Sequence, residues 1–211
     1  MHILSILAHP RSNSFCHAIS SRVRSTLVAA GHTVDHHDLY AERFDPCLTA
    51  QEAYTIGDTL EDALARASDP VLHRHREAIR RADGLVVVHP NWWGKPPAIL
   101  AGWMDRVLVP GVAYRLDTPE GLPDGLLRLT HALIINTSDT PAEREANDLG
   151  DPLESIWRAC VLPFCGVQSH ARLVFRPVNG SAMADRQVWL DDSASQCETH
   201  FGRTPKTVTE R

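Results

Sequence analysis

Short apolar runs alternate with amphipathic stretches along most of the chain. The apolar runs are bounded by polar residues, glycine or proline, which is typical of strands buried in a parallel sheet. They predict strands at residues 2–8, 33–38, 84–89, 132–136 and 172–176. The amphipathic stretches predict helices at residues 14–30, 71–82, 97–107, 153–165 and 184–196. Strands that alternate with helices predict an α/β fold in which right-handed crossovers place helices on both faces of the sheet.

The 211 residues are most simply a single domain, which we expect to span residues 1–197. Residues 198–211 are polar and lack periodicity, so we expect a tail that is frayed or that lies on a partner subunit. Residues 45–70 form a polar, helix-prone insertion that is too long for a plain connection. We expect this insertion to be functional or to form part of an interface.

Charge and cysteine content narrow the partners and the compartment. A formal net charge of −5 gives no reason to expect nucleic acid or an anionic membrane as a partner. The longest apolar run is far shorter than a membrane span, and Met1 leads directly into a predicted strand. We therefore expect neither membrane insertion nor a signal peptide. Five cysteines, an odd number with no CxxC pair, fit reduced thiols in the cytoplasm better than a disulfide framework.

The most informative loop follows the apolar run at residues 85–88. It reads His-Pro-Asn-Trp-Trp-Gly-Lys-Pro-Pro and leads into a predicted helix. Trp92 and Trp93 would stand at the carboxyl end of a central strand, where open α/β sheets bind their ligands. The pair indicates a wall for a flat aromatic cofactor, although adjacent tryptophans also occur in cores and dimer interfaces.

The loop after the first predicted strand excludes two common nucleotide sites. Residues 8–15 contain no glycine, so neither the GxGxxG fingerprint nor a Walker A loop is present there. Ser12, Asn13 and Ser14 instead place hydroxyl and amide groups at the start of a helix, whose N–H groups and dipole attract anions. These serines are equally suited to capping the helix, a role that is compatible with binding phosphate.

The order of the strands decides which loops meet. In a flavodoxin-like sheet of order 2-1-3-4-5, the switch point lies between the first and third strands. The loops at residues 9–15 and 89–94 would then form one crevice, with a phosphate-binding side and an aromatic side. We expect this fold: a doubly wound, five-stranded parallel sheet in a three-layer sandwich.

These loops resemble those of the flavodoxin-like NAD(P)H:quinone oxidoreductases. This family includes DT-diaphorase, modulator of drug activity B and the regulatory oxidoreductases of potassium efflux. The resemblance runs through nearly the whole predicted domain and is most specific in the block from His89 onward. The stretches that carry it are Ala8-His9 with Ser14-Phe15, Asp38-Leu39-Tyr40 with Phe44-Asp45-Pro46, the block from His89 to Tyr114, and Phe164-Cys165-Gly166.

The resemblance implies a flavin site built from three loops. The first loop would hold the phosphate end of the flavin, with His9, Ser12, Asn13, Ser14, Phe15 and Cys16. The second would bring backbone amides to the edge of the isoalloxazine ring, with Pro90, Asn91, Trp92, Trp93 and Gly94. The third would contact the pyrimidine side of the ring, with Asn136, Thr137, Ser138 and Asp139.

Three further residues are assigned by the same resemblance. Tyr114 and Trp93 would shape the cavity for the substrate, and Arg186 would lie near the adenine half of FAD. FAD is narrowly favoured over FMN, because the Ser14-Phe15 start resembles that of the FAD-binding branch. The implied reaction is a ping-pong hydride transfer from NAD(P)H to the flavin and then to a quinone or another flat aromatic acceptor. The flavin would carry this chemistry, so we expect no catalytic side chain.

The third loop departs from the family pattern. Many relatives have Thr-Thr-Gly-Gly where this chain has Asn-Thr-Ser-Asp, and the loss of both glycines opposes close backbone approach to a flavin. A carboxylate at Asp139 would repel an anionic reduced flavin, so we expect it to turn away or to cap the next segment. Residues 141–151 also lack the tyrosine and histidine that diaphorase-type enzymes place there.

Two other classes of function are weighed against the enzyme. One is a regulatory flavoprotein subunit that controls a partner such as a potassium efflux system. The other is a response regulator, which needs an acidic pair after the first strand and a lysine after the last. The first predicted strand ends in Ala8-His9 and the last ends in Phe175-Arg176-Pro177, which discounts a response regulator.

Apolar residues at helical spacing predict a homodimer with its flavin sites at or beside the interface. They exceed what a five-stranded sheet needs to cover its faces, and they are Trp103, Met104, Val107, Ile156, Trp157 and Cys160. The resemblance points the same way, since members of the family pair and let residues of the Tyr114 type close a neighbour's cavity.

No metal site is predicted. His73, Arg74 and His75 lack a carboxylate or cysteine companion at ligand spacing, so we interpret them as a solvated helix face. His36 and His37 are interpreted as exposed residues at the edge of the sheet. Cys160 and Cys165 are five residues apart on one apolar helix and are predicted to be buried core thiols.

Overall fold

Five parallel strands form one sheet in the order β2-β1-β3-β6-β7. They are β1 (His2–Leu7), β2 (Thr33–Asp38), β3 (Gly84–Pro90), β6 (His131–Thr137) and β7 (Ser169–Phe175). The computed structural model describes residues 1–53, 59–115 and 124–202. Counted along the sheet alone, this order is 2-1-3-4-5, so the predicted flavodoxin-like topology is confirmed.

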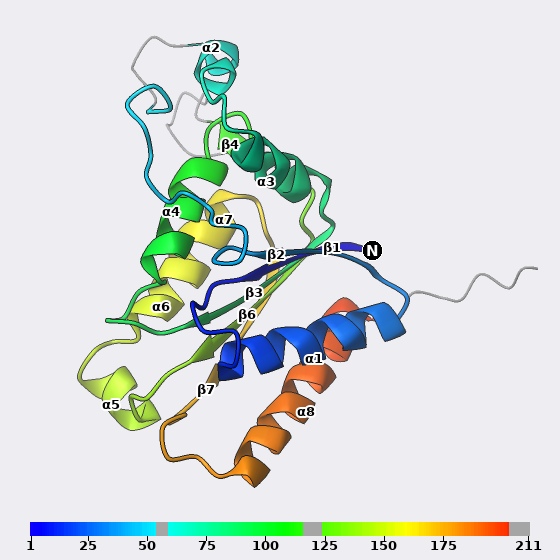
Figure 1. The fold of residues 1–211 in the computed structure, drawn as a ribbon, viewed down its shortest axis with the longest axis vertical. Helices are drawn as coiled ribbons and strands as arrows, with labels where there is room; N and C mark the ends of the chain where they lie inside the picture. The colour runs from blue at the N-terminus through cyan, green and yellow to red at the C-terminus, as the bar shows by residue number, and fades with distance from the viewer. Residues whose placement is uncertain (54–58, 116–123, 203–211) are drawn as a thin grey trace, which may run out of the picture.

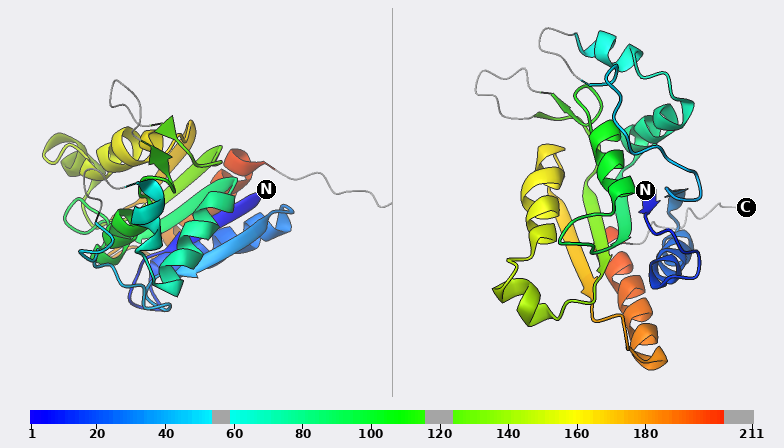
Figure 2. Two further views of the ribbon diagram at one scale, coloured as in Figure 1. Left: turned by 90° about the horizontal axis from the view of Figure 1, so that it is seen from above. Right: turned by 60° about the vertical axis from the view of Figure 1, so that its left-hand side comes forward.

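Helices cover both faces of the sheet, as Figures 1 and 2 show. One face carries α1 (Phe15–Ala29) and α8 (Met183–Phe201), whose apolar side chains pack with those of alternate strand residues in one core cluster. The other face carries α3 (Pro70–Arg81), α4 (Ala98–Val107) and the helical residues 152–164 in a second cluster. Because successive side chains of a strand point to opposite faces, the apolar run in β3 contributes to both clusters.

Residues 152–164 do not form the regular helix that was predicted. They comprise α6 (Pro152–Glu154), the π-helical segment η1 (Ser155–Val161) and α7 (Leu162–Phe164). Pro163 has no N–H to donate, and its ring crowds the carbonyl four residues earlier, so the wider π spacing accommodates it.

Four short elements were not predicted. They are α2 (Leu60–Ala65), α5 (Ala142–Asn147), and the strands β4 (Tyr114–Arg115) and β5 (Asp124–Gly125), which pair with each other. The α2 helix lies within the predicted insertion at residues 45–70, of which 54–58 are outside the described residues. Before that gap, Glu52 forms a buried ion pair with Arg106 of α4, whose Nε donates to Glu52 Oε2 at 2.9 Å.

The last helix is longer than predicted, so the tail begins later than residue 198. Cys197 and Phe201 are four residues apart on the buried face of α8, and Phe201 is only 6 % exposed. It fills space that a side chain at Gly84 would need, since a Cβ there would lie 2.8 Å from its ring. Residues 203–211 lie outside the described residues.

The apolar residues that predicted a dimer belong largely to the chain's own core. Trp103, Val107 and Trp157 are fully buried within the single chain. Met104 and Ile156 are half-buried against the same cluster, and Cys160 is exposed rather than buried. The argument for a surplus of apolar surface is therefore wrong for Trp103, Val107 and Trp157, whereas Met104 and Cys160 line a mostly apolar cavity.

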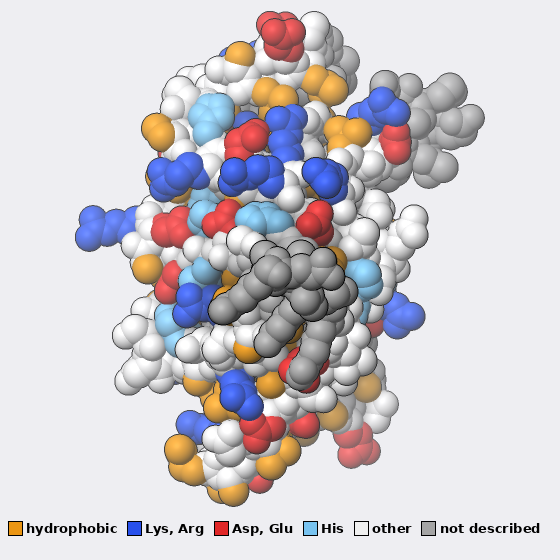
Figure 3. Space-filling model, turned by 90° about the vertical axis from the view of Figure 1, so that its right-hand side faces the viewer, with side chains coloured by type: hydrophobic (Ala, Val, Ile, Leu, Met, Phe, Trp, Pro, Cys, Tyr) orange, Lys and Arg blue, Asp and Glu red, His pale blue; other side chains and the backbone are white. Residues whose placement is uncertain are grey.

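Charged side chains of opposite sign stand beside one another on the face drawn in Figure 3. Among the described residues, ion pairs join Arg81 to Asp35 and Arg128 to Asp83, each at 3.8 Å. Exposed pairs of this kind contribute little stability, so the fold depends on its two apolar clusters. Within the described chain, no helix has the length and apolarity needed to cross a bilayer.

Candidate functional site

Three loops meet at the carboxyl edge of the sheet, after β1, β3 and β6, and enclose a crevice of about 230 Å³. The switch point predicted from the strand order therefore brings the first and second loops together. The crevice is lined by His9, Arg11, Ser14, Phe15, Cys16, Pro90, Asn91, Trp92, Thr137, Ser138, Asp139, Thr140 and Val178. Among the predicted flavin-binding residues, Ser12, Asn13, Trp93, Gly94, Asn136 and Arg186 do not line it.

The start of α1 supplies the polar side of the crevice. Ser14 caps the helix, because its Oγ accepts a hydrogen bond from the backbone N–H of His17 at 3.4 Å. The first turn of a helix leaves backbone N–H groups without partners inside the helix, and its dipole favours an anion there. Arg11 adds a positive charge beside these donors, although the sequence reasoning did not single it out. A basic residue in a loop with helix-capping serines was the signal that could have identified it.

His9 and Cys16 lie at the base of this loop and are both uncharged at neutral pH. Burial and the nearby charge of Arg11 lower the pKa of His9. Its Nδ1 accepts a hydrogen bond from the Arg11 N–H at 3.1 Å, so the proton of the neutral ring is on Nε2. Burial raises the pKa of Cys16 to about 11, and its thiol contacts Thr137 Oγ1 at 3.2 Å. Cys16 is therefore a packed thiol and not a nucleophile.

A tight turn at residues 92–95 forms the aromatic side of the crevice. The backbone N–H of Trp92 donates to the carbonyl of Lys95 and that of Lys95 donates back, both at 3.2 Å. The two central residues, Trp93 and Gly94, have φ angles of 60° and 71°, which is the geometry of a type I′ turn. A left-handed conformation costs a residue with a Cβ roughly 1–2 kcal/mol.

This turn sends the two indoles in different directions. Trp92 lines the crevice, and its ring centroid lies 6.0 Å from that of His9. Trp93 is at the tip of the turn and is 96 % exposed, against 38 % for Trp92. The two residues do not form one wall within a single chain.

Asn136 faces the interior and not the crevice. Its Nδ2 donates to His89 Nε2 at 2.7 Å, and its Oδ1 accepts from Arg172 Nε at 2.7 Å. Trp157 Nε1 also donates to His89 Nε2, at 3.0 Å. Burial lowers the pKa of His89 to about 4, so the ring is neutral and its Nδ1–H donates to the Pro90 carbonyl at 2.9 Å. This network fixes the floor of the crevice from behind.

The rest of the third loop lies at the crevice. Thr137 and Ser138 line it, and the Ser138 N–H donates to the carbonyl of Phe175 at 3.0 Å. Asp139 accepts a hydrogen bond from the backbone N–H of Asn179 at 2.6 Å. This carboxylate therefore binds the loop that follows β7, and it does not cap the segment that comes next in the chain, where the Thr140 N–H donates to Ser138 Oγ.

Arg186 lies behind Phe15 and supports the crevice indirectly. Its guanidinium is 5.9 Å from the centroid of the Phe15 ring. Its Nε donates to Ser181 Oγ at 2.8 Å, and its Nη2 donates to the Val178 carbonyl at 3.1 Å. These contacts hold the loop that follows β7 against the start of α1.

Tyr114 lines a different cavity from the candidate site. The α4 helix has 10 residues and runs back from the carboxyl edge over about 15 Å, so β4 lies at the far end of the molecule in Figure 1. There Tyr114 and Phe164 pack edge to face at 4.7 Å beside a mostly apolar cavity of about 490 Å³. This cavity is larger than the crevice, but the crevice is at the switch point and has the helix N-terminus and Arg11.

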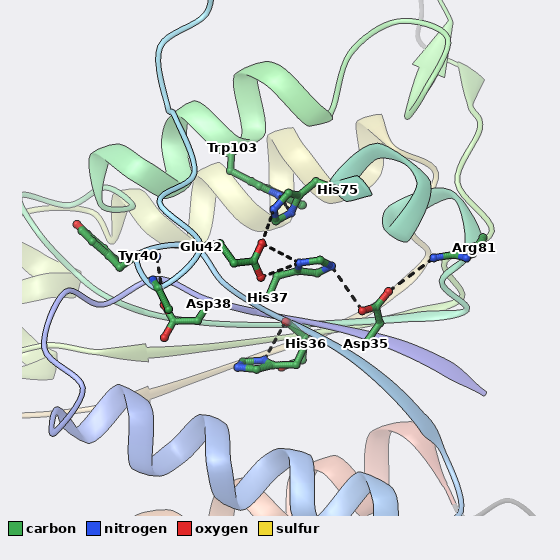
Figure 4. Close-up of polar contacts among 11 residues, drawn as sticks. Asp35, His36, His37, Asp38, Tyr40, Glu42, His75, Arg81 and Trp103 are labelled. Atoms are coloured by element: carbon green, nitrogen blue, oxygen red, sulfur yellow. Dashed lines mark hydrogen bonds and ion pairs between the residues drawn. The ribbon is translucent and has the colours of Figure 1, made fainter. Parts of the chain in front are cut away.

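A second group of polar side chains lies at the end of β2, shown in Figure 4. His37 and His75 are buried, so the interpretation of both as exposed residues was wrong. His37 Nδ1 lies 2.9 Å from Glu42 Oε1, and His75 Nε2 lies 3.0 Å from Glu42 Oε2. This group could not be recognised in the sequence, because its members come from three separate segments: β2, the following loop and α3.

The hydrogen bond from Trp103 determines what this group can do. Trp103 Nε1 donates to His75 Nδ1 at 3.1 Å, so the proton of His75 is on Nε2 and faces Glu42. A metal ion would need the lone pair of Nε2 and a proton on Nδ1, where the indole offers a second donor. The nitrogen and oxygen atoms of His37, Glu42 and His75 that could bind a metal ion lie within 4.8 Å of one another. The protonation of His75 nevertheless makes this arrangement a hydrogen-bonded network.

Replacing Glu42 by Gln tests this network through the pH dependence of stability. Burial raises the pKa of Glu42, but hydrogen bonds and charge from His37 and His75 outweigh burial and lower it from 4.5 to about 2. A lowered carboxyl pKa stabilises the fold above pH 4.5, and this contribution is lost as the pH falls toward 2. We expect urea unfolding to show the variant about 1–2 kcal/mol less stable at pH 7. The difference should shrink below pH 4.5, and a difference that is constant from pH 7 to pH 3 would contradict the assignment.

Comparison with known proteins agrees with the fold. A family model described as flavodoxin-like fold matches residues 1–199. The chain is 36 % identical to an NAD(P)H oxidoreductase of Haemophilus influenzae over 61 % of its own length and 59 % of that protein. It is 31 % identical to the human ribosyldihydronicotinamide dehydrogenase [quinone] over 78 % of its length and 76 % of that enzyme. The crystal structure of Smu.1420 from Streptococcus mutans has a sequence 28 % identical to this chain. The two structures superpose with a TM-score of 0.79, over 94 % of this chain and 100 % of the other.

The family model covers the three loops of the crevice and the elements on both faces of the sheet. The family model includes every strand of the sheet, and the human relative shares about three quarters of its length with this chain. The chain belongs to the flavodoxin-like fold family, together with these NAD(P)H and quinone dehydrogenases.

Proposed function

We propose that the protein is a flavin-dependent NAD(P)H oxidoreductase that reduces quinones or similar flat aromatic acceptors by hydride transfer. The observation that carries the proposal is the crevice at the switch point, where Arg11 and the N-terminus of α1 face Trp92. The relatives named for NAD(P)H and quinone support the donor and the class of acceptor.

The residues of the crevice fit a flavin at two points. Arg11, Ser14 and the first turn of α1 are suited to a phosphate. The N–H groups of Trp92 and Lys95 close the aromatic turn, and that of Gly94 donates to Asn91 Oδ1, which leaves the N–H of Trp93 for a ligand at the ring edge. The volume of about 230 Å³ is below the range of about 300–1,000 Å³ that encloses a typical ligand, so one chain would cover only part of a flavin.

A bound flavin would accept hydride from NAD(P)H and pass it to the acceptor. The chain's part is to bind and orient the ring and to stabilise negative charge on it through backbone N–H groups. The high pKa of Cys16 keeps its thiol protonated, and the lowered pKa of His9 keeps its ring neutral with Nε2–H as a donor. No covalent step through these side chains is needed, in keeping with chemistry carried by the cofactor.

Trp92 is the side chain whose loss should weaken flavin binding most directly. We expect Trp92→Ala to reduce the affinity for FMN and FAD by roughly 1–3 kcal/mol, since the indole supplies aromatic packing at the crevice. Titration of the protein by flavin fluorescence measures this loss, with Val28→Ala at the exposed far end of α1 as the control. The wild-type flavoprotein should then oxidise NAD(P)H with a quinone by ping-pong kinetics. A wild-type protein that binds neither flavin would overturn the proposed function.

FAD is the more specific proposal for the cofactor. It rests on the resemblance of Ser14-Phe15 to the FAD-binding branch, and Phe15 lines the crevice with Arg186 behind its ring. Two hydrogen bonds of the Arg186 guanidinium go to the loop after β7. The geometry therefore supports flavin binding by Phe15 more strongly than contact of Arg186 with adenine. Mass spectrometry of the cofactor released from purified protein should detect FAD, and FMN alone would reverse this choice.

The five free cysteines support a cytoplasmic location.

A homodimer is proposed on the incomplete crevice, together with the Tyr114 contact that the family resemblance implies. The crevice covers only part of a flavin, Trp93 exposes its indole beside it, and Tyr114 and Phe164 border an apolar cavity at the other end of the chain. A twofold axis would let the Tyr114 end of each chain cover the crevice of the other. Light scattering at micromolar concentration should give the mass of a dimer. A fully active monomer would show that neither the interface nor a shared site is needed.

A further inference from the structure

Glu145 is a buried carboxylate behind the wall of the crevice. It lies on α5, and its side chain is only 2 % exposed. Oε1 accepts a hydrogen bond from Asn91 Nδ2 at 3.1 Å. Oε2 is buried and has no hydrogen-bond partner among the described residues, and Arg176 Nη1 lies 3.6 Å from it. Because burying a carboxylate is costly, its position under the aromatic loop calls for a role.

The contact with Asn91 extends to the turn that carries the tryptophans. An amide that donates through Nδ2 to Glu145 has its Oδ1 on the opposite side, where it accepts the backbone N–H of Gly94 at 2.9 Å. Gly94 is the third residue of the turn, and its bond with Asn91 fixes the orientation of the peptide that precedes it. Glu145 thus determines which way the Asn91 amide faces, and the amide determines the path of the turn.

The main chain of Asn91 is also bound to the neighbouring strand, so only its side chain is free to change orientation in the contact with Glu145. Its backbone N–H donates to the Thr137 carbonyl at 2.7 Å, which fixes the main chain at the edge of the sheet. Arg176 follows directly after β7 and places a positive charge beside Glu145. Groups that follow β3 and β7 therefore converge on this one carboxylate.

We propose that Glu145 is a positioning residue for the flavin site. Its carboxylate orients the amide of Asn91, which binds the Gly94 N–H and so fixes the turn at residues 92–95 that places Trp92 at the crevice. The effect of Glu145 on flavin binding rests on the proposed function, but the orientation of the turn can be measured without a flavin.

Three variants separate this role from simple packing. Glu145→Gln keeps an acceptor oxygen for Asn91, Glu145→Ala removes it, and Glu145→Met removes it while filling the buried volume. Glu143→Gln, on the exposed side of the same helix, is the matched control. If the alanine variant does not fold, the methionine variant carries the test, because it keeps the buried volume filled and leaves no cavity.

The first readout is hydrogen exchange of the Gly94 amide by NMR in the flavin-free protein. We expect about tenfold faster exchange in the alanine and methionine variants, and wild-type exchange in the glutamine and control variants. The second readout is flavin affinity, for which we expect Kd to rise about tenfold in the same two variants only. Rescue by glutamine distinguishes orientation of Asn91 from a requirement for buried charge.

Two results would overturn the inference. One is an unchanged Gly94 amide in the methionine variant, and the other is a glutamine variant that behaves as the alanine variant does. A wild-type protein that binds no flavin would refute the proposed function alone, since the Gly94 amide would still report whether Glu145 positions the turn.

Discussion

The pairing of β1 with β3 is the constraint on which the site depends. The chain leaves β1 toward one face of the sheet and leaves β3 toward the other, so their loops separate and open a crevice between them. Hydrogen bonds between neighbouring strands hold these loops side by side at the carboxyl edge of the sheet. The Ala8 N–H donates to the Val88 carbonyl at 3.0 Å, and the Asn91 N–H donates to the Thr137 carbonyl at 2.7 Å. The position of the crevice thus follows from backbone pairing and needs no particular side chain.

Side chains then give the crevice its chemistry through buried polar contacts behind it. His89 is neutral and joins Asn136 and Trp157 under the floor, while Glu145 holds Asn91 under the aromatic turn. None of these residues needs to touch a ligand. In a low-dielectric interior each must be hydrogen-bonded, and the bonds that satisfy it also fix the loop above it.

The elements that could be predicted are those set by local pattern. The five strands of the main sheet follow from apolar periodicity. Their order is that of the flavodoxin-like fold, which the glycine-free first loop favoured over a dinucleotide-binding fold, and the rule for switch points then gives the two loops of the crevice. The direction of the Trp93 side chain could not be predicted, because it depends on a positive φ angle that a residue with a Cβ seldom adopts. The burial of His75 depends on Trp103, which is 28 residues away in sequence, and the position of Tyr114 depends on the length of α4. Tertiary contacts of this kind leave no periodic signal in a single sequence.

The central claim is that the crevice at the carboxyl edge holds a flavin. A crystal structure of the protein with its flavin tests this most directly. We expect electron density for the phosphate beside Arg11 and the first turn of α1, with the isoalloxazine edge at the N–H of Trp93 and Trp92 beside the ring. Density for the ring within the cavity beside Tyr114 and Phe164 of the same chain, with the crevice empty, would contradict the account.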